Sequence, residues 1–319
     1  MSAAADVGST SAHLLVASLE ARQVRALADE SVFLDLGAVV DERGILGEEV
    51  TAELVANLRG FAERARTLGA PGLTAVGTEP LRRALDAARA VRAIERDLGL
   101  PLHVISHDEE ALLTLVGVTA GRPVTGELAV VDVGGGSTEL IVVGADRNPA
   151  TVAGFRLGAA RLTARFALED PPTGASLEAM RGEARARIAA APEMRPSELV
   201  AVGGTADNLL KILPVAMIDR TLTPERIREA LAILAREPAE AVAARYGLRP
   251  LRARLLPAGA AILAAVLERY GVERLPVSGA GMRDGLAIVS ARAGGAWRDR
   301  LATLSLGWPE WEPPDRGPA

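Results

Sequence analysis

At 319 residues the chain is long enough for about two ordinary domains, and its composition, 49% hydrophobic and 24% charged, is that of a compact protein. It contains no cysteine, which excludes disulfides, zinc–thiolate sites and cysteine nucleophiles, and its 3 histidines argue against a histidine-rich metal centre. The formal net charge of −5 argues against a general nucleic-acid binder, although a local cluster of arginines still permits an anionic substrate.

Neither a membrane-spanning segment nor a secretory signal is predicted. No run reaches the roughly 18 uninterrupted apolar residues of a membrane span. The N-terminus has no basic segment followed by an apolar one. We therefore expect a cytoplasmic protein whose partners include neither a membrane nor a nucleic acid.

The first half of the chain begins with a β-hairpin. Residues 4–17, AADVGSTSAHLLVA, are two apolar runs joined by a small polar turn. Helical spacing of apolar residues predicts helices at 48–69, 80–99 and about 108–119, and short apolar runs predict strands at 73–78 and 102–106. The Gly/Pro-rich stretch 120–127 reads as a domain boundary.

The second half repeats this scheme, starting with the hairpin AVVDVGGGSTELIVV at 129–143. The same patterns predict helices near 157–168 and at 176–190, 223–236 and 250–270, a strand at 198–202, and a strand–turn–helix at 275–292. Because both halves start alike, we expect two duplicated domains, 1–124 and 125–292. We expect the Pro-rich tail, 293–319, to be loosely docked, with residues about 290–305 packing back on the first domain.

Four glycine-rich turns follow short apolar strands, and they lie at 6–11, 132–138, 203–206 and 278–281. Such turns expose backbone N–H groups that can hold phosphate oxygens, although any one alone is more often a simple tight turn. In the second turn, three glycines at 134–136 allow close approach of a ligand, and Ser137 and Thr138 supply hydroxyl donors. Asp132 and Glu139 flank this turn with the hard oxygen ligands that Mg²⁺ prefers.

Seven segments occur in the order seen in one known family. They are DVGSTSAHLLVA, LRRALDA, ISHDEEALLTLVGV, VVDVGGGSTELIVV, RLGAARLTARF, VAVGGTADNL and LPVSGAGMRDGLA. From about Ala4 to Arg292 the chain resembles the exopolyphosphatases and pppGpp phosphohydrolases. The resemblance implies an α/β fold of two actin-like (ribonuclease H-like) domains with an interdomain cleft and hydrolysis of a terminal phosphate with Mg²⁺.

The resemblance also implies a role for individual residues. Glu110 matches the glutamate that positions and deprotonates the attacking water, and Arg82 matches an arginine that binds phosphate. The residues implied for Mg²⁺ are Asp132, Glu139 and Asp6. The residues implied for binding the substrate phosphates are Gly8, Ser9, Thr10, Ser11, Gly134, Gly135, Gly136, Ser137, Thr138 and Gly204. Without the resemblance, Glu109 and Glu110 also read as an acidic pair at a helix N-terminus, and Arg82 as part of a solvated helix face.

The sequence departs from the family pattern at several positions. Thr10 stands where an asparagine is usual, Ala5 where a bulky aliphatic residue is usual, and His107 where glycine is common. Glu79 is unusual in the loop before Arg82. These changes affect the expected geometry of the first phosphate-binding turn rather than the class of protein.

The sequence favours an exopolyphosphatase that releases orthophosphate from inorganic polyphosphate, including short chains, because no accessory domain follows the two predicted ones. Three alternatives remain: a pppGpp 5′-phosphohydrolase, an ATP-dependent small-molecule kinase, and a non-catalytic sensor of nucleotide or polyphosphate. Arginines at 156, 161, 165, 181, 185 and 187 either line a route for a polyanionic chain or are solvated, and most read as solvated. A homodimer is suggested by analogy with the family alone.

Overall fold

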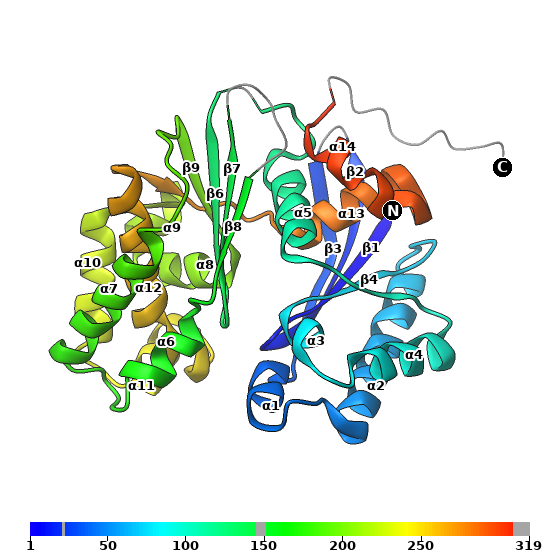
Figure 1. The fold of residues 1–319 in the computed structure, drawn as a ribbon, viewed down its shortest axis with the longest axis horizontal. Helices are drawn as coiled ribbons and strands as arrows, with labels where there is room; N and C mark the ends of the chain where they lie inside the picture. Colours follow the sequence, from blue (N-terminus) through cyan, green and yellow to red (C-terminus); the bar gives the residue numbers. More distant parts are fainter. Residues whose placement is uncertain (21–22, 125, 145–150, 309–319) are drawn as a thin grey trace. The chain divides into compact units, whose positions relative to one another are not determined.

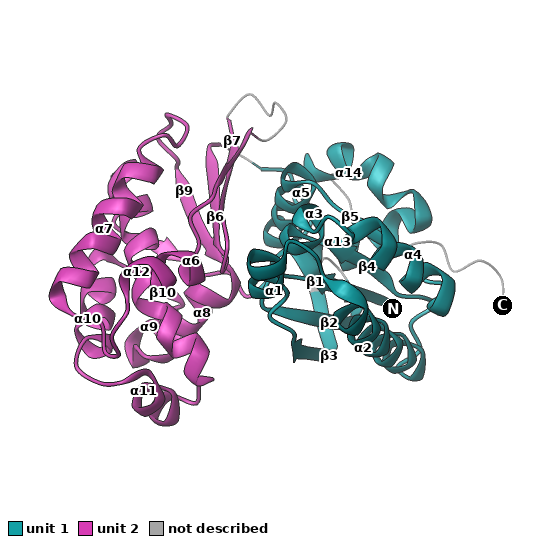
Figure 2. Cartoon of the chain, turned by 60° about the horizontal axis from the view of Figure 1, so that its bottom comes forward, with its two compact units in different colours: residues 1–124, 280–319 teal, residues 125–279 magenta. Residues whose placement is uncertain are grey.

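The computed structural model describes residues 1–20, 23–124, 126–144 and 151–308. The chain divides into two compact units, shown in different colours in Figure 2. The first unit contains Met1–Val124 and Ala280–Ala319, and the second contains Thr125–Gly279. Each unit is built on its own sheet, with helices packed against it (Figure 1).

The first unit has a five-stranded sheet of order β3-β2-β1-β4-β5. Its strands are β1 (Ser2–Val7), β2 (Ser11–Glu20), β3 (Gln23–Phe33), β4 (Thr74–Gly77) and β5 (Leu102–Val104). The hairpin β1–β2 is antiparallel, whereas β4 and β5 run parallel to β1. The carboxyl ends of β1, β4 and β5 therefore meet at one edge of the sheet, which is where open α/β sheets bind ligands.

Helices cover both faces of this sheet. They are α1 (Leu36–Arg43), α2 (Gly47–Thr67), α3 (Glu79–Arg83), α4 (Ala87–Leu98), α5 (His107–Thr119), α13 (Met282–Ala293) and α14 (Trp297–Ser305). Successive side chains of β1 point to opposite faces of the sheet, where two separate apolar cores lie. Ala3, Ala5 and Val7 belong to the core formed with α2 and α4. Ala4 belongs to the core formed with α5, α13 and α14. A strand buried on both faces explains the run of small apolar residues at 3–5.

Residues 280–292, which the sequence assigned to the second domain, belong to the first unit. Two glycines explain this placement, because a Cβ at Gly117 of α5 would collide with the carbonyl of Gly281, and one at Gly285 with the carbonyl of Leu113. Close backbone approach therefore packs α13 on α5. Residues 297–305 form α14, which packs on α5 with Trp297 buried; the rest of the predicted tail, from 309, lies outside the described residues.

The second unit has a four-stranded sheet of order β8-β7-β6-β9, with strands β6 (Leu128–Val133), β7 (Thr138–Val143), β8 (Thr151–Phe155) and β9 (Glu198–Val202). A short pair, β10 (Thr221–Leu222) and β11 (Leu275–Pro276), is separate. The helices are α6 (Ala159–Phe166), α7 (Gly174–Ile188), α8 (Gly203–Lys211), α9 (Pro214–Asp219), α10 (Pro224–Leu234), α11 (Ala239–Tyr246) and α12 (Pro250–Tyr270).

Helix α12 is the core helix of the second unit. Among the described residues it is the one helix long and apolar enough to span a membrane by length and composition, but 72% of its apolar window is buried within the protein. Its side chains belong to the same apolar cluster as those of α7, α8 and α10, which surround it (Figure 1). The apolar length of α12 is thus explained by core packing.

The predicted helix at 80–99 is two helices, α3 and α4, which is a correction. The chain leaves α3 at Ala84, whose backbone is extended, and α4 begins after Asp86. The Asp86 carboxylate accepts hydrogen bonds from the amides of Leu46 (2.8 Å) and Gly47 (2.9 Å). Although burial opposes it, these bonds hold the pKa of Asp86 below its usual value. The break separates Arg82 from the arginines of α4, so Arg82 is not on the solvated face that the sequence suggested.

Candidate active site

The turn between β1 and β2 is the first predicted phosphate-binding loop. The amide of Gly8 donates to the carbonyl of Ser11 (3.0 Å), which closes the turn. The carbonyls of Ser9 and Thr10 accept from the amides of Gly37 (2.8 Å) and Leu34 (3.0 Å). Because a planar peptide directs its C=O and the following N–H in opposite directions, the amides of Thr10 and Ser11 point away from these partners.

The turn between β6 and β7 has the same design. The amide of Gly134 donates to the carbonyl of Ser137 (2.9 Å), as Gly8 does to Ser11. The carbonyls of Gly134 and Gly135 accept from the first amides of α6, at Ala159 and Ala160 (2.9 Å each). By the same peptide geometry, the amides of Gly135 and Gly136 point away from α6, as a backbone nest for an anion requires.

Two further contacts hold the second turn in place. The side chain of Arg161 donates from Nε to the carbonyl of Gly136 (3.1 Å), and Thr138 donates to the carbonyl of Leu157 (2.5 Å). Gly158 lets α6 start this close, because a Cβ there would collide with the backbone of Gly135. Arg161 therefore supports the loop from behind, a role that the sequence did not suggest.

A second repeat lies at the ends of the parallel strands beside the hairpins. Thr78, after β4, donates from Oγ1 to the carbonyl of Val7 (3.2 Å), and Thr205, after β9, donates to the carbonyl of Val133 (2.7 Å). The two threonines hold equivalent carbonyls, each just before the glycine turn. The signal in the sequence is the likeness between AVGT at 75–78 and AVGGT at 201–205, which the comparison of the two hairpins missed.

Asp132 and Glu139 lie directly opposite one another on β6 and β7. Cross-strand partners project from the same face of a sheet, so the two carboxylates lie side by side. Glu139 is 5% exposed, and Gly203, with φ of +85°, leaves the space that the Asp132 carboxylate occupies. Gly203 opens α8, and the positive end of a helix stabilises a nearby carboxylate.

The corresponding pair in the first unit has a different charge. Asp6 lies opposite His13, and its carboxylate is 3.4 Å from Nε of Arg283 on α13. Arg283 also pairs with Asp29 of β3. Burial raises the pKa of Asp6, while His13 and Arg283 act against that rise. Asp6 thus has a histidine and an arginine as neighbours where Asp132 has a second carboxylate, and its binding of metal stays a prediction.

The structure brings together the two predicted catalytic side chains. Arg82 of α3 donates from Nη1 to Oε2 of Glu110 (2.9 Å) and to the carbonyl of Ile105 (2.8 Å). His107 lies 3.1 Å from Nη2 of Arg82, and thus contacts the arginine. Both charged side chains are largely buried, at 16% exposed for Arg82 and 22% for Glu110. They lie where β4 and β5 end.

Glu109 is held in a different way from Glu110. It forms a capping box with Ser106, whose amide donates to Glu109 (2.7 Å) and whose hydroxyl accepts from the Glu109 amide (3.1 Å). Arg298 of α14 also donates to Glu109, from Nε (2.5 Å) and from Nη2 (2.9 Å). Although burial opposes it, Arg298 and Ser106 hold the pKa of Glu109 below its usual 4.5. Glu109 is therefore a structural residue that fixes the start of α5.

The contacts of Ser106 and Arg298 with the Glu109 carboxylate, called here the Arg298 clamp, predict that the stability of the fold depends on pH. A carboxylate with a depressed pKa stabilises the fold above its unfolded pKa, and this stabilisation is lost as the pH falls through its folded pKa. We expect Arg298→Ala to raise the pKa of Glu109 and to lower the free energy of unfolding at pH 7 by about 1 kcal/mol, since the pair is partly solvated. Denaturant unfolding at pH 7 and pH 3 measures this, and the deficit should shrink at pH 3. Arg300→Ala, on the exposed side of α14, is the control. If Arg298→Ala lost the same free energy of unfolding at pH 7 and at pH 3, the Arg298 clamp would be contradicted.

The remaining predicted residues support the turns or lie beside them. Ser9 donates its hydroxyl to Glu79 (2.9 Å), which also binds Arg83 (2.6 Å), so the unusual glutamate supports the first turn. Gly204 is exposed in the first turn of α8, beside the Gly203 that contacts Asp132. The glycine turn at 278–281 ends at Gly281, whose carbonyl packs against Gly117.

Each unit thus combines a β-hairpin, a glycine-rich turn and a parallel strand ending in a threonine, which is the arrangement of paired actin-like domains. The chain matches the Ppx/GppA phosphatase family over residues 15–292, and it belongs to that family. The solved structure of a Ppx/GppA protein from Aquifex aeolicus is 25% identical, covers 92% of this chain and 98% of its own, and superimposes with a TM-score of 0.80. The expected α/β class with two actin-like domains is confirmed.

Curated relatives carry two different names. A guanosine-5′-triphosphate,3′-diphosphate pyrophosphatase of Vibrio vulnificus is 29% identical over 291 residues, which cover 89% of this chain and 58% of that protein. The chain thus spans less than two thirds of the length of this relative. A Haemophilus influenzae protein named "Putative exopolyphosphatase" is 26% identical over 289 residues, which cover 89% of both chains.

Proposed function

We propose that this protein hydrolyses the terminal phosphoanhydride bond of inorganic polyphosphate and releases orthophosphate. The Arg82–Glu110 ion pair carries the proposal. Removal of a terminal phosphoryl group needs little covalent chemistry from the protein, but it needs a positioned water and donors that stabilise charge on the phosphoryl oxygens. A largely buried carboxylate beside an arginine, at the edge where parallel strands end, supplies both kinds of group.

In this proposal Glu110 accepts the proton of the attacking water, and Arg82 binds an oxygen of the phosphoryl group. Glu109 is less suited to the base because the capping box and Arg298 already occupy its carboxylate oxygens. Within the same unit, the amides of Thr10 and Ser11, which point away from the partners of their turn, would donate to further phosphate oxygens.

Asp132 and Glu139 fit a bound Mg²⁺. The described residues contain no group of three or more potential protein ligands, and Mg²⁺ in phosphate-processing sites uses one or two carboxylates together with water and substrate oxygens. Two carboxylates side by side on β6 and β7 meet that requirement. When bound there, the ion would offset negative charge on the phosphate oxygens.

A pppGpp 5′-phosphohydrolase is the second candidate, because the Vibrio relatives have that kind of name. The match to the Haemophilus protein named "Putative exopolyphosphatase", which covers 89% of both chains, supports polyphosphate. Orthophosphate release from polyphosphate and from pppGpp, measured with Mg²⁺ and no acceptor, separates the two. A higher kcat/KM for polyphosphate than for pppGpp supports the proposal. Phosphate release from pppGpp alone would instead identify the protein as a pppGpp 5′-phosphohydrolase. If neither substrate released phosphate, both hydrolase functions would be excluded, and a kinase or a non-catalytic sensor would remain.

A further inference from the structure

A basic groove of ≈ 600 Å³ lies at the outer edge of the first unit's sheet. Its walls come from α3, α4 and α14, and its base from β5 at the sheet edge. Three arginines line it, Arg82, Arg92 and Arg298, and no carboxylate of the described residues does. Arg82 belongs both to this groove and to the ion pair with Glu110.

One arginine of the groove lacks an acceptor in the part of the chain that the structure describes. Within that part, the side chain of Arg92 forms no hydrogen bond or ion pair, whereas Arg89 and Arg96 on the same helix pair with Glu48 (3.2 Å) and Asp97 (2.7 Å). Arginine donors are normally paired when carboxylates are near, so this arrangement fits an anionic ligand.

The uncharged lining of the groove strengthens this interpretation. Leu81, Val91 and Leu102 supply apolar surface beside the guanidinium groups. His103 is in edge contact with Trp297 (5.6 Å between ring centroids). The pKa of His103 is lowered mainly by burial and in addition by the nearby positive charge of Arg298. These uncharged side chains add no negative charge that would compete with a bound anion for the arginines.

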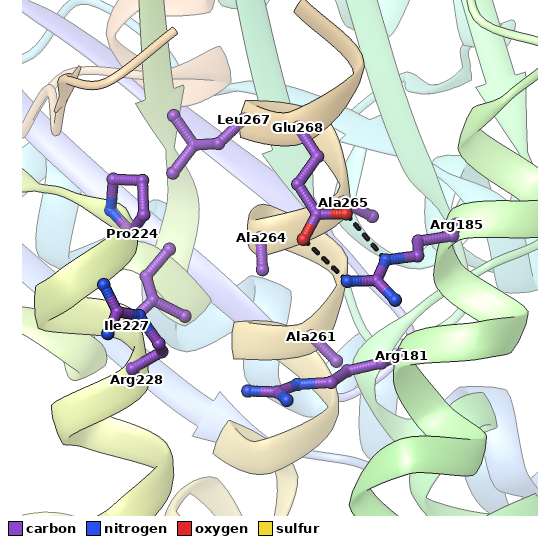
Figure 3. A pocket seen from close by; sticks show the side chains of 10 residues that line it. All are labelled: Arg181, Arg185, Pro224, Ile227, Arg228, Ala261, Ala264, Ala265, Leu267 and Glu268. Carbon is purple, nitrogen blue, oxygen red and sulfur yellow. Dashed lines mark hydrogen bonds and ion pairs between the residues drawn. The ribbon is translucent and has the colours of Figure 1, made fainter. Parts of the chain in front are cut away.

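A second cavity also contains arginines. It has a volume of ≈ 180 Å³, lies among α7, α10 and α12 in the second unit, and is also lined by three arginines (Figure 3). Each of these is paired with a carboxylate: Arg185 with Glu268, Arg181 with Glu178, and Arg228 with Glu225. In the groove of the first unit Arg82 and Arg298 are paired as well, with Glu110 and Glu109, so the difference between the two cavities is Arg92. Arg181 and Arg185, for which the sequence left open a polyanion route or a solvated face, are therefore each neutralised by a glutamate.

We propose that the groove at Arg92 binds the inner phosphates of a linear phosphate chain whose terminal phosphate is bound by Arg82 at Glu110. This inference rests on the proposed function and adds to it a preference for long chains over short ones. Successive phosphates carry regularly spaced negative charges, and arginine binds phosphate oxygens in pairs. A second phosphate-binding position would hold the substrate without taking part in the chemistry.

The test compares Arg92→Glu with Arg96→Glu, a substitution on the same helix with the same change of charge. For long-chain polyphosphate we expect Arg92→Glu to raise KM about threefold to tenfold, the range for one partly exposed charge contact, with kcat unchanged. KM for tripolyphosphate and pppGpp should stay within about twofold, and Arg92→Lys should restore most of the long-chain effect. Arg96→Glu should change none of these.

Other outcomes would overturn the groove assignment. An unchanged long-chain KM in Arg92→Glu would do so, and so would an equal rise in Arg96→Glu, which indicates general charge attraction. A rise for pppGpp alone would mean that the groove binds a nucleoside. If the wild type released no phosphate, the proposed function would fail, but calorimetric titration of polyphosphate into wild type and Arg92→Glu would still test the groove.

Discussion

Replacement of Glu110 by glutamine is expected to lower kcat for phosphate release by about 10²- to 10⁴-fold, the range for loss of a general base. Glutamine keeps the size of the side chain and can still accept a hydrogen bond from Arg82, but it cannot take a proton from water. KM should change little, since the arginine and the turn amides remain. Steady-state phosphate release with Mg²⁺ at saturating substrate measures the effect.

Glu109→Gln is the matched control, because it removes the adjacent carboxylate from the same helical turn. Glutamine still permits a capping box, so we expect activity within about threefold of wild type and a modest loss of stability. If Glu109→Gln lost as much activity as Glu110→Gln, the distinction drawn from the Arg298 clamp would be wrong. If Glu110→Gln kept the kcat of the wild type, the assignment of Glu110 as the general base would be wrong.

The hairpins and many helices were predictable because their signals are local. The strand at 198–202 and the helix at 250–270 have the predicted bounds, and both depend on continuous apolar patterns with clear end signals. The resemblance of short motifs then supplied Glu110 and Arg82, each separately, as the expected catalytic residues. Both residues lie in strongly patterned segments, and the structure brings them into contact.

The features that could not be predicted depend on contacts between residues far apart in the chain. The break before α4 is fixed by Asp86 bonding to amides about forty residues earlier, and the first turn is supported by Glu79 from seventy residues later. The placement of α13 in the first unit depends on Gly285 meeting α5. Such contacts leave no periodic pattern in the sequence, because one side chain or one missing Cβ decides each of them.

The two hairpins also show that a repeat in sequence need not repeat a chemistry. The turns close with the same hydrogen bond, and a threonine holds the preceding carbonyl in each. The cross-strand partner of the aspartate differs, however, since it is His13 in the first unit and Glu139 in the second. Duplicated architecture therefore presents an aspartate–histidine pair in one unit and a dicarboxylate in the other, and the dicarboxylate has the ligands that a divalent cation prefers.

The carboxylate of Asp132 is expected to contribute to Mg²⁺ binding. Asp132→Asn should weaken Mg²⁺ binding by about 10-fold to 100-fold, as losses of metal-site interactions typically do, and should lower phosphate release at millimolar Mg²⁺ accordingly. Asparagine fills the same space against Gly203 and removes only the charge, so the fold should be retained. Calorimetric titration of Mg²⁺ into the protein gives the affinity independently of activity, and the Mg²⁺ dependence of phosphate release gives the functional effect.

Asp207→Asn in the same helix α8 is the control for this prediction. Asp207 is 2.6 Å from Arg220, so Mg²⁺ affinity should be unchanged while that surface ion pair is lost. If Asp132→Asn and wild type bound Mg²⁺ equally, the carboxylate pair on β6 and β7 would not be the metal site. Asp132 would then act directly on the substrate or its water, and a lower kcat with unchanged Mg²⁺ dependence would be the mark of that role.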